Sequence, residues 1–210
     1  MCVRYASSGD AARRWGNAPK TATERGIVTG ELFPGEVGGY ATADGELIEA
    51  RWGLQPFWAK DAGFGRRNAY NARGETLSEK PTFRNAFRLR RCVLPASAFY
   101  ERAEGRWLRV EPTEGEGFLF AGLWEEANER TEGLPTYTMV TTEPNAAVGE
   151  VHDRMPVVLS PEDAGAWMDP DAALDELRAL LLPCPPEWTR IEDAGPISRK
   201  KAKPEEPGLF

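Results

Sequence analysis

The chain has 210 residues, of which 41% are hydrophobic, and this length and composition fit one globular domain with a sizeable core. No apolar run approaches the ~18 residues that a membrane span requires, and the amino terminus lacks the basic and apolar regions of a signal peptide, so we expect a cytoplasmic protein without a membrane partner. One histidine and three widely spaced cysteines fit neither a zinc motif nor a disulfide framework, and we expect no metal and no cofactor.

Charge is distributed unevenly along the chain. The net charge of -7 argues against a nucleic-acid partner for the molecule as a whole. Residues 51–109, however, contain 13 lysines and arginines against 5 acidic residues. Arginine, whose planar guanidinium suits phosphate, dominates this segment. The segment is therefore interpreted either as a solvated charged face or as a phosphate-binding surface.

The amino-terminal part of the chain is predicted to contain a short strand, a short helix and a β-hairpin. The strand covers residues 2–5, and the serine, glycine and aspartate at residues 8–10 can cap a helix over residues 11–15. The hairpin strands are residues 37–41 and 46–52, since the aspartate-glycine pair between them tolerates positive φ.

The basic middle segment is predicted to contain two loops and a helix. Residues 53–58 are interpreted as an aromatic loop and residues 63–67 as a flexible basic loop. Residues 81–91 are predicted to be helical, because their apolar side chains recur three and four residues apart on one face. A second, basic stripe on this helix consists of Arg84, Arg88 and Arg91.

The second half of the chain is rich in predicted strands separated by turns. These strands cover residues 92–94, 98–102, 107–110, 118–124 and 136–142. Residues 160–163 resemble a capping box and begin a helix towards Met168, and residues 171–182 form another helix. Residues 199–210 have little to bury and are predicted to be a disordered tail. We expect an α+β fold, a single domain over residues 1–198 with a mixed, mainly antiparallel, β-rich and barrel-like core flanked by short helices.

Cys2 is the first candidate functional residue. The initiator methionine is commonly removed when the next side chain is small, so Cys2 can become the amino terminus and carry both an amine and a thiol. An α-amino group titrates near ~7.7 to 8.0, and an appreciable fraction is therefore an unprotonated nucleophile at neutral pH. Such an amine can attack an aldehyde, after which the thiol can close a thiazolidine ring. The alternative is a buried cysteine that serves only as a small hydrophobe.

Four further stretches place polar, reactive side chains between apolar ones. They are residues 52–59 (WGLQPFWA), 71–76 (NARGET), 99–101 (FYE) and 152–156 (HDRMP). With Cys2, and in this order, they resemble the SOS response-associated peptidase (SRAP) family, whose members shield abasic sites in single-stranded DNA by a covalent bond to residue 2. The resemblance runs from Met1 to about Leu159. The chain departs from the family at Val3, where glycine is usual, and at its end, which lacks the usual valine-asparagine pair.

The resemblance implies a catalytic site and a DNA-binding surface. It implies that Cys2 is the nucleophile, that Asn71 positions its backbone and amine, and that Glu101 and His152 move protons. The expected partner is single-stranded DNA containing abasic sites, including single-strand/double-strand junctions, bound by a monomer. The expected DNA-binding residues comprise arginines that hold phosphates and aromatic side chains that contact bases. The resemblance gives these roles to Arg4, Arg73, Arg154, Trp52, Phe57 and Trp58, and the basic stripe predicted on residues 81–91 adds Arg84 and Arg88.

The chemistry of these residue types gives independent, less specific support. Ring-closed deoxyribose is a hemiacetal, so exposure of its aldehyde requires a proton at the ring oxygen, which a carboxylic acid or an imidazolium can supply. Glu101 and His152 are the candidates, and their alternatives are a salt-bridged glutamate and a structural histidine. Asn71 can equally be a turn residue. The aromatic side chains can be core residues or, where exposed, can stack on a base or wedge a strand junction.

Three functions are consistent with these observations. The preferred one is an enzyme that shields abasic sites through a thiazolidine crosslink at Cys2 and removes its own Met1, with autopeptidase or lyase-like chemistry. The second is an amino-terminal-nucleophile amidase or peptidase, in which the thiol attacks a carbonyl and the amine serves as base. The third is a non-catalytic module that binds single-stranded DNA.

Overall fold

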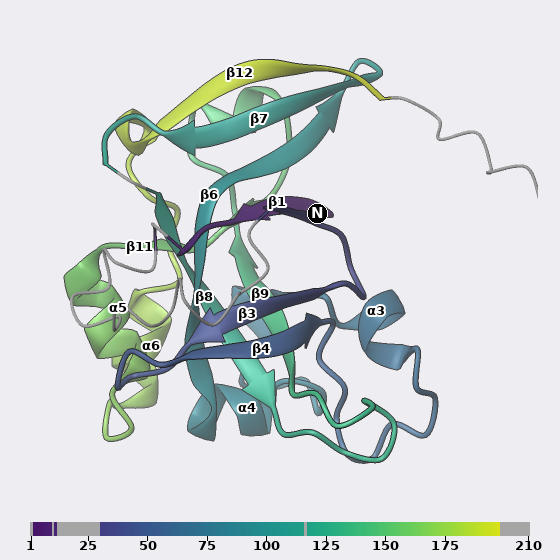
Figure 1. Ribbon diagram of the computed structural model, residues 1–210. Helices are drawn as coiled ribbons and strands as arrows, with labels where there is room; N and C mark the ends of the chain where they lie inside the picture. The colour runs from purple at the N-terminus through teal and green to yellow at the C-terminus, as the bar shows by residue number, and fades with distance from the viewer. Residues whose placement is uncertain (1, 10, 12–29, 116, 198–210) are drawn as a thin grey trace, which may run out of the picture.

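A five-stranded barrel organises the protein (Figure 1). The computed structural model describes residues 2–9, 11, 30–115 and 117–197, and the strands of these residues form one 12-stranded sheet. Around the barrel the strands follow the order β3 (Val37–Ala41), β4 (Leu47–Trp52), β9 (Thr136–Thr142), β8 (Phe118–Glu125) and β6 (Arg91–Ala103). The barrel closes because β6 is hydrogen-bonded both to β8 and to β3. All of these pairs are antiparallel except β4 with β9.

The remaining strands extend the barrel. The antiparallel strand β1 (Arg4–Ser7) lies between β6 and β2 (Gly30–Leu32). An antiparallel ribbon of β7 (Arg106–Pro112) and β12 (Thr189–Pro196) continues from the second half of β6. Three short strands complete the sheet, β5 (Asn71–Arg73) and β10 (Met155–Pro156) against β9, and β11 (Val158–Leu159) against β8.

The helices are short and lie outside the barrel. The α-helices of the described residues are α3 (Phe64–Asn68), α4 (Arg84–Leu89), α5 (Pro161–Met168) and α6 (Leu174–Ala179), and the 3-10 helices are η1 (Gly74–Thr76), η2 (Val148–Glu150) and η3 (Pro186–Trp188). At the start of α5 the Asp163 amide donates to the Ser160 hydroxyl at 3.0 Å, as the capping pattern predicts. The predicted α+β fold with a barrel-like, mainly antiparallel core is confirmed.

Several predicted boundaries are wrong. The two strands predicted over 92–94 and 98–102 are one 13-residue strand, because β6 exchanges its partner β8 for β7 along its length and Pro95 interrupts neither ladder. The strand predicted over residues 2–5 lies at Arg4–Ser7. The helices predicted over 81–91 and 171–182 are shorter, as α4 and α6. The helix expected over residues 11–15 and the tail over residues 199–210 fall outside the described residues, apart from Ala11.

The segment predicted as a flexible basic loop is helix α3. Its backbone packs closely on the preceding loop, because a Cβ atom at Gly65 would lie 2.2 Å from the Gly53 carbonyl oxygen. The Gln55 side chain also accepts a hydrogen bond from the Gly65 amide at 3.1 Å. Here the glycines permit close backbone contact, so they do not indicate a mobile loop.

The barrel interior forms the core beside which Cys2 lies. Its largest fully buried side chains include Tyr5, Trp52, Phe99 and Tyr137. The hydroxyl groups of Tyr5 and Tyr137 form a buried hydrogen bond of 2.5 Å, which joins β1 to β9 across the barrel. A second apolar cluster packs α4, α5 and α6 against the outside of the same strands. The start of β1 is therefore held in place by the packed core.

Candidate functional site

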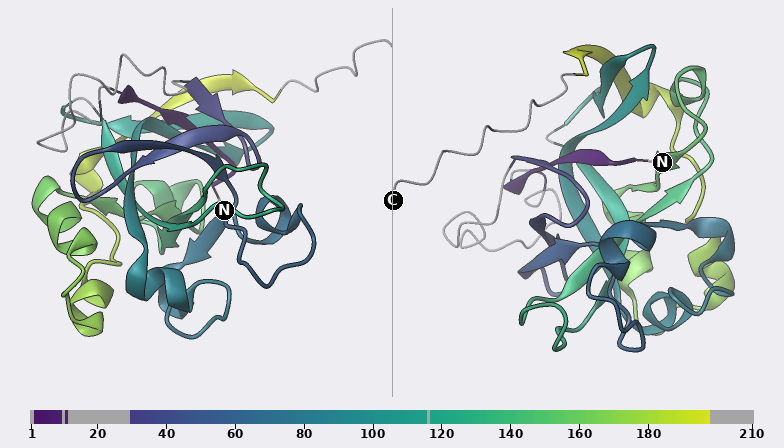
Figure 2. Two further views of the ribbon diagram at one scale, coloured as in Figure 1. Left: turned by 60° about the horizontal axis from the view of Figure 1, so that its bottom comes forward. Right: turned by 90° about the vertical axis from the view of Figure 1, so that its right-hand side faces the viewer.

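Cys2 lies immediately before β1, and its side chain is completely buried. Because Arg4 pairs with Tyr100, Cys2 lies beside the end of β6 that carries Glu101. The side-chain amide of Asn71 donates a hydrogen bond to the Cys2 carbonyl oxygen at 2.6 Å, and the thiol donates to the Arg4 carbonyl at 3.4 Å. In the right-hand view of Figure 2, the start of β1 lies between the β7–β12 ribbon and α3.

The position of Asn71 is set by β9 and by Trp52. Asn71 begins β5 and pairs with Met139 of β9. The Tyr70 carbonyl just before it accepts two hydrogen bonds, from the Trp52 indole at 2.7 Å and from the Met139 amide at 3.2 Å. Trp52, which we expected to contact DNA, is fully buried in the barrel and has no ring face open to a ligand. The structure therefore corrects that expectation and gives Trp52 a supporting position behind Asn71.

Glu101 and His152 form a pair next to Cys2. Glu101 is buried on β6, and its Oε2 lies 3.4 Å from Nε2 of His152. On the other side of the imidazole, Nδ1 accepts a hydrogen bond from the Arg154 amide at 3.0 Å. The Arg154 amide favours a neutral ring with its proton on Nε2, the nitrogen that faces Glu101, whereas the Arg154 carbonyl oxygen at 3.1 Å and Asp153 Oδ1 at 3.2 Å from Nδ1 favour the other tautomer. The two side chains are thus arranged to exchange a proton.

The environment moves the pKa values of this pair toward each other. Burial raises the pKa of Glu101 to about 7, and the Asp153 carboxylate adds to this shift. Burial lowers the pKa of His152. Around neutral pH a carboxyl with a pKa of about 7 is present in both its protonated and its ionised form, and the lowered pKa of His152 favours its neutral form, so the pair can supply an acid and a base.

The Cys2 thiol is held in its neutral form. Burial raises the pKa of this thiol, and the nearby Glu101 carboxylate raises it further. A thiolate is the reactive form of cysteine in nucleophilic enzymes, so the side chain alone is a poor nucleophile in this environment.

Two buried acceptor atoms at the site lack a hydrogen-bond partner within the described part of the chain. They are Oδ1 of Asn71 and Oε1 of Glu101. A buried polar atom without a partner costs ~1 to 3 kcal/mol, and such atoms are commonly satisfied by a ligand. Both belong to residues that flank Cys2, so the site offers acceptors to an amine or a hydroxyl group.

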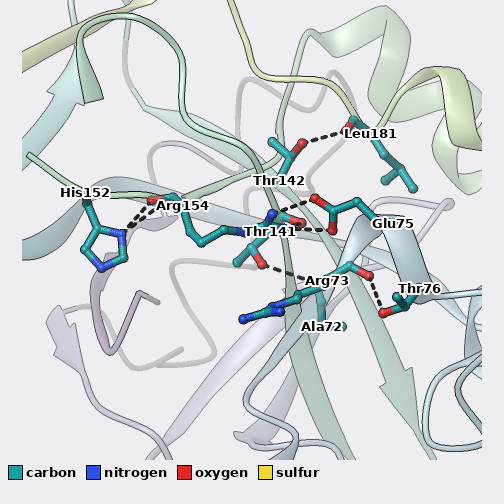
Figure 3. Close-up of polar contacts among 9 residues, drawn as sticks. All are labelled: Ala72, Arg73, Glu75, Thr76, Thr141, Thr142, His152, Arg154 and Leu181. Atoms are coloured by element: carbon teal, nitrogen blue, oxygen red, sulfur yellow. Dashed lines mark hydrogen bonds and ion pairs between the residues drawn. The ribbon is translucent and has the colours of Figure 1, made fainter. Parts of the chain in front are cut away.

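The three arginines expected to hold phosphate differ in their surroundings. Arg73 is exposed, and its guanidinium has no hydrogen-bond or ion-pair partner among the described residues (Figure 3). Arg4 makes an ion pair of 2.5 Å with Glu31, and its guanidinium lies 4.1 Å from the centroid of the Tyr100 ring. Arg154 is bound by Glu75. Of these three, Arg73 alone presents a guanidinium without a partner among the described residues.

The aromatic loop and helix α4 supply the other expected contacts. Phe57 and Trp58 have exposed fractions of 71% and 45%, so their rings are available at the surface. Arg84 and Arg88 are exposed on α4. This helix lies next to the first residue of β6, whereas Glu101 lies near the other end of the strand (Figure 1). The structure therefore does not bring Arg84 and Arg88 together with Cys2.

Arg91 does not belong to the expected basic stripe. It is buried, and its guanidinium donates hydrogen bonds of 2.6 to 2.8 Å to four backbone carbonyls at the ends of α4 and α5. These carbonyls belong to Phe87, Arg88, Trp167 and Asp169. Arg91 is thus a structural cation that satisfies helix ends.

Glu75 is a site residue to which the sequence analysis assigns no role. It lies in the 71–76 motif, two residues after Arg73, and this placement is the only signal in the sequence.

Among the described residues, no group of three or more histidine, cysteine, aspartate and glutamate side chains is placed to hold a metal ion. None of the helices described is long and apolar enough to cross a membrane.

Comparisons with known proteins identify similar sequences. A family model described as SOS response associated peptidase (SRAP) matches residues 1–195. The abasic site processing protein YoqW of Bacillus subtilis is 42% identical over 154 residues, which cover 67% of this chain and 66% of that protein. The abasic site processing protein HMCES of Xenopus tropicalis is 30% identical over 151 residues, 59% of this chain and 45% of that protein. The match thus spans just under two thirds of the Bacillus relative and less than half of the Xenopus one.

Solved structures share the fold over nearly the whole chain. A protein from Bacteroides thetaiotaomicron superposes with a TM-score of 0.81 at 25% identity, covering 91% of both chains. A protein from Bordetella bronchiseptica gives a TM-score of 0.77 at 26% identity and covers 91% of this chain and 99% of that one.

Proposed function

Because the chain belongs to the SOS response-associated peptidase family, we propose that it processes abasic sites in single-stranded DNA by a covalent crosslink from Cys2. The observation that carries the proposal is the 2.6 Å hydrogen bond from Asn71 to the Cys2 carbonyl, beside the Glu101–His152 pair. It fixes the backbone of residue 2 next to two groups that can move protons. The relatives named abasic site processing proteins supply the substrate class.

The reaction begins with the amine that Met1 removal exposes. Hydrolysis of the Met1–Cys2 peptide bond consumes one water, and we infer that the protein carries out this step itself, with Glu101 as the base that activates the water. The new amine adds to the aldehyde carbon of the ring-opened deoxyribose, and loss of one water gives a Schiff base. The thiol sulfur then bonds to the same carbon, and the thiol proton moves to the nitrogen. The product is a five-membered thiazolidine ring.

A neutral thiol suits this sequence of steps. The amine is the first nucleophile, and sulfur attacks an already activated imine carbon, so a low thiol pKa is not required. Ring closure removes the imine, which would otherwise promote strand cleavage by β-elimination. A stable adduct on an unbroken strand therefore results. The same raised pKa of Cys2 disfavours the amidase alternative, in which the thiol must attack a carbonyl directly.

Glu101 and His152 supply the proton transfers. Opening of the sugar hemiacetal needs a proton at the ring oxygen, and amine attack needs a base. Glu101, whose pKa of about 7 leaves both of its forms populated near neutral pH, and the neutral form of His152, which its lowered pKa favours, provide both. Oδ1 of Asn71 and Oε1 of Glu101, the unsatisfied acceptors, would receive hydrogen bonds from the Cys2 amine or from sugar hydroxyl groups.

The DNA strand would pass the site along the exposed guanidinium of Arg73. Arg4 lies beside the same site and would contact phosphate after exchanging its carboxylate partner Glu31, whereas Arg154 would keep Glu75 as its partner. The exposed rings of Phe57 and Trp58 would stack on bases, including those at a single-strand/double-strand junction. Arg84 and Arg88 would contact a more distant part of the DNA.

Intact mass spectrometry tests the proposal. The purified protein should lack Met1, and mixing with single-stranded DNA that carries one abasic site should give the summed mass of protein and DNA less one water. Cys2→Ala should give no stable adduct while retaining binding to intact DNA. Cys2→Ser would retain activity in an amidase but cannot form a thiazolidine. Absence of the adduct in the unmodified protein, or its persistence in Cys2→Ala, would overturn the proposal.

A further inference from the structure

Both terminal nitrogens of the Arg154 side chain are bound by the protein (Figure 3), whereas its buried Nε has no hydrogen-bond partner among the described residues. Its two terminal nitrogens meet the two carboxylate oxygens of Glu75 at 2.5 and 3.0 Å, and one of them also donates to the Thr141 carbonyl at 2.8 Å. Only 11% of the side chain is exposed. The paired, parallel hydrogen bonds are the strongest arrangement that arginine and a carboxylate form. Arg154 is therefore fixed to the 71–76 segment and to β9.

The backbone of Arg154 holds the imidazole of His152. Its amide donates to Nδ1 at 3.0 Å, and its carbonyl oxygen lies 3.1 Å from the same nitrogen. The next residue, Met155, begins β10 and pairs with Thr142 of β9. The position of Arg154 thus sets the turn in which His152 lies, and with it the direction of the ring.

This connection reaches the proton-transfer pair. The Arg154 amide, which donates to Nδ1, favours a neutral ring with its proton on Nε2, 3.4 Å from Glu101. The Asp153 carboxylate and the Arg154 carbonyl lie 3.2 and 3.1 Å from the same Nδ1 and favour the other tautomer, so the position of the amide decides between the two. Loss of the anchor at Glu75 would free the turn and allow the other tautomer. Partners of this kind determine which ring nitrogen of a histidine carries the proton.

We propose that Glu75 is a positioning residue, whose carboxylate anchors Arg154 so that the Arg154 backbone fixes the tautomer and orientation of His152 toward Glu101. The inference deepens the proposed function, because its kinetic test rests on crosslinking. A competing role for Glu75 is to occupy Arg154 until a phosphate displaces it. The low exposure of Arg154 and its additional bond to Thr141 favour the anchoring role.

The sole histidine of the chain allows a direct spectroscopic test. In protein labelled with [15N]histidine, the imidazole signals arise from His152 alone. At pH 8, above the ordinary histidine pKa of ~6.5, the ring should show the Nε2–H tautomer. Glu75→Gln should shift both ring nitrogen signals toward a mixture of tautomers. Glu79→Gln, which removes the same charge at an exposed position four residues further along the chain, should leave them unchanged.

Arg154→Lys keeps the positive charge but loses the paired hydrogen bonds, and it should reproduce the spectrum of Glu75→Gln. This second variant keeps the test valid if Glu75→Gln unfolds, which a thermal melt would reveal. Unchanged imidazole signals in either folded variant would overturn the inference. The result does not depend on DNA, so it stands apart from the success or failure of the proposed function.

Single-turnover crosslinking supplies the second readout. Glu75→Gln should slow adduct formation by about 10- to 100-fold, the range for misplacing a catalytic group by about 1 Å. Its affinity for intact single-stranded DNA should stay within twofold of the unmodified protein, as should both quantities in Glu79→Gln. Tighter DNA binding with an unchanged rate would identify Glu75 as a competitor of phosphate and would overturn the positioning role.

Discussion

Because the Cys2 side chain is buried, the thiol and the amine of a processed amino terminus differ in reactivity. Burial raises the pKa of the thiol, whereas the α-amine formed by Met1 removal has an ordinary pKa of ~7.7 to 8.0. The amine is thus the nucleophile available at neutral pH, and the thiol acts afterwards. An amide at the same position has neither a free lone pair nor the ability to form a Schiff base.

The first prediction uses this difference. A variant with one additional, untrimmable residue before Cys2 should form no crosslink, because the amine becomes part of a peptide bond. The measurement is the heat-resistant species on a denaturing gel after incubation with abasic single-stranded DNA. Intact single-stranded DNA serves as the control. If the blocked protein crosslinks as fast as the processed one, a thiol or lysine side chain performs the chemistry.

The second prediction concerns the proton-transfer pair. Glu101→Gln and His152→Ala should slow crosslink formation by ~10²-fold or more, the usual loss when one general acid or base is removed. Binding to intact DNA should remain near normal, because neither side chain is expected to hold phosphate. Single-turnover rates equal to those of the unmodified protein in both variants would exclude the pair from the mechanism.

Glu101 should also affect how the free energy of unfolding depends on pH. Its folded pKa of about 7 lies above the unfolded value, so ionisation opposes folding. Its favourable contribution is complete below the unfolded pKa of ~4.3 and is lost as pH rises through the folded pKa. Glu101→Gln should therefore gain stability relative to the unmodified protein between pH 4 and pH 8, by ~3 kcal/mol at most. Urea unfolding at the two pH values measures the difference, and an equal difference at both would contradict the raised pKa.

Among the elements, β4 and β5 show how the barrel supports the site. The Trp52 indole at the end of β4 donates to the carbonyl that precedes Asn71. Trp52→Phe keeps an aromatic ring but removes this donor, and it should destabilise the fold by ~1 to 3 kcal/mol. Crosslinking should slow because Asn71 is less firmly placed, whereas DNA affinity should not change. If Trp52→Phe lowered the DNA affinity without lowering the free energy of unfolding, Trp52 would instead lie at the DNA surface.

Local signals in the sequence predict some elements well. The β3–β4 hairpin follows from its aspartate-glycine turn, and the start of α5 follows from Ser160 and Pro161. The continuity of β6 and the helical state of α3 depend on partners distant in sequence, which local patterns do not contain. The predicted helix therefore included Arg91, although its guanidinium is fixed by carbonyls of α5 far along the chain.

The same difference between local sequence signals and contacts between distant segments applies to the functional site. The motifs identify Cys2, Asn71, Glu101 and His152, and the structure brings these residues into contact in two pairs. Sequence alone does not reveal that Trp52 is buried while Trp58 is exposed, since both lie in one aromatic stretch and their exposure depends on the barrel. It also does not reveal the partner of Arg154, because the ion pair with Glu75 joins segments that are far apart in sequence.

At the scale of the whole molecule, DNA binding must overcome a net charge of -7. Long-range repulsion between an acidic protein and DNA is screened by salt, whereas local contacts between arginine and phosphate are weakened by it. Most of the arginines at the site are already paired with carboxylates, and Arg73 is the exposed one without such a partner among the described residues. The number of phosphates neutralised should therefore be small.

The final prediction follows from this charge arrangement. Affinity for intact single-stranded DNA should fall with salt by a log-log slope of about -0.7 for each phosphate neutralised, with little dependence on base sequence. Arg73→Gln should weaken binding and reduce the magnitude of the slope by ~0.7, the value of one lost contact. Arg178→Gln, on the exposed surface of α6, removes the same charge elsewhere on the molecule and serves as the control. Fluorescence anisotropy across a salt series measures both quantities. A slope that Arg73→Gln leaves intact would mean that the strand runs along other cations, and binding that tracks one base sequence would argue against a path defined by phosphate contacts.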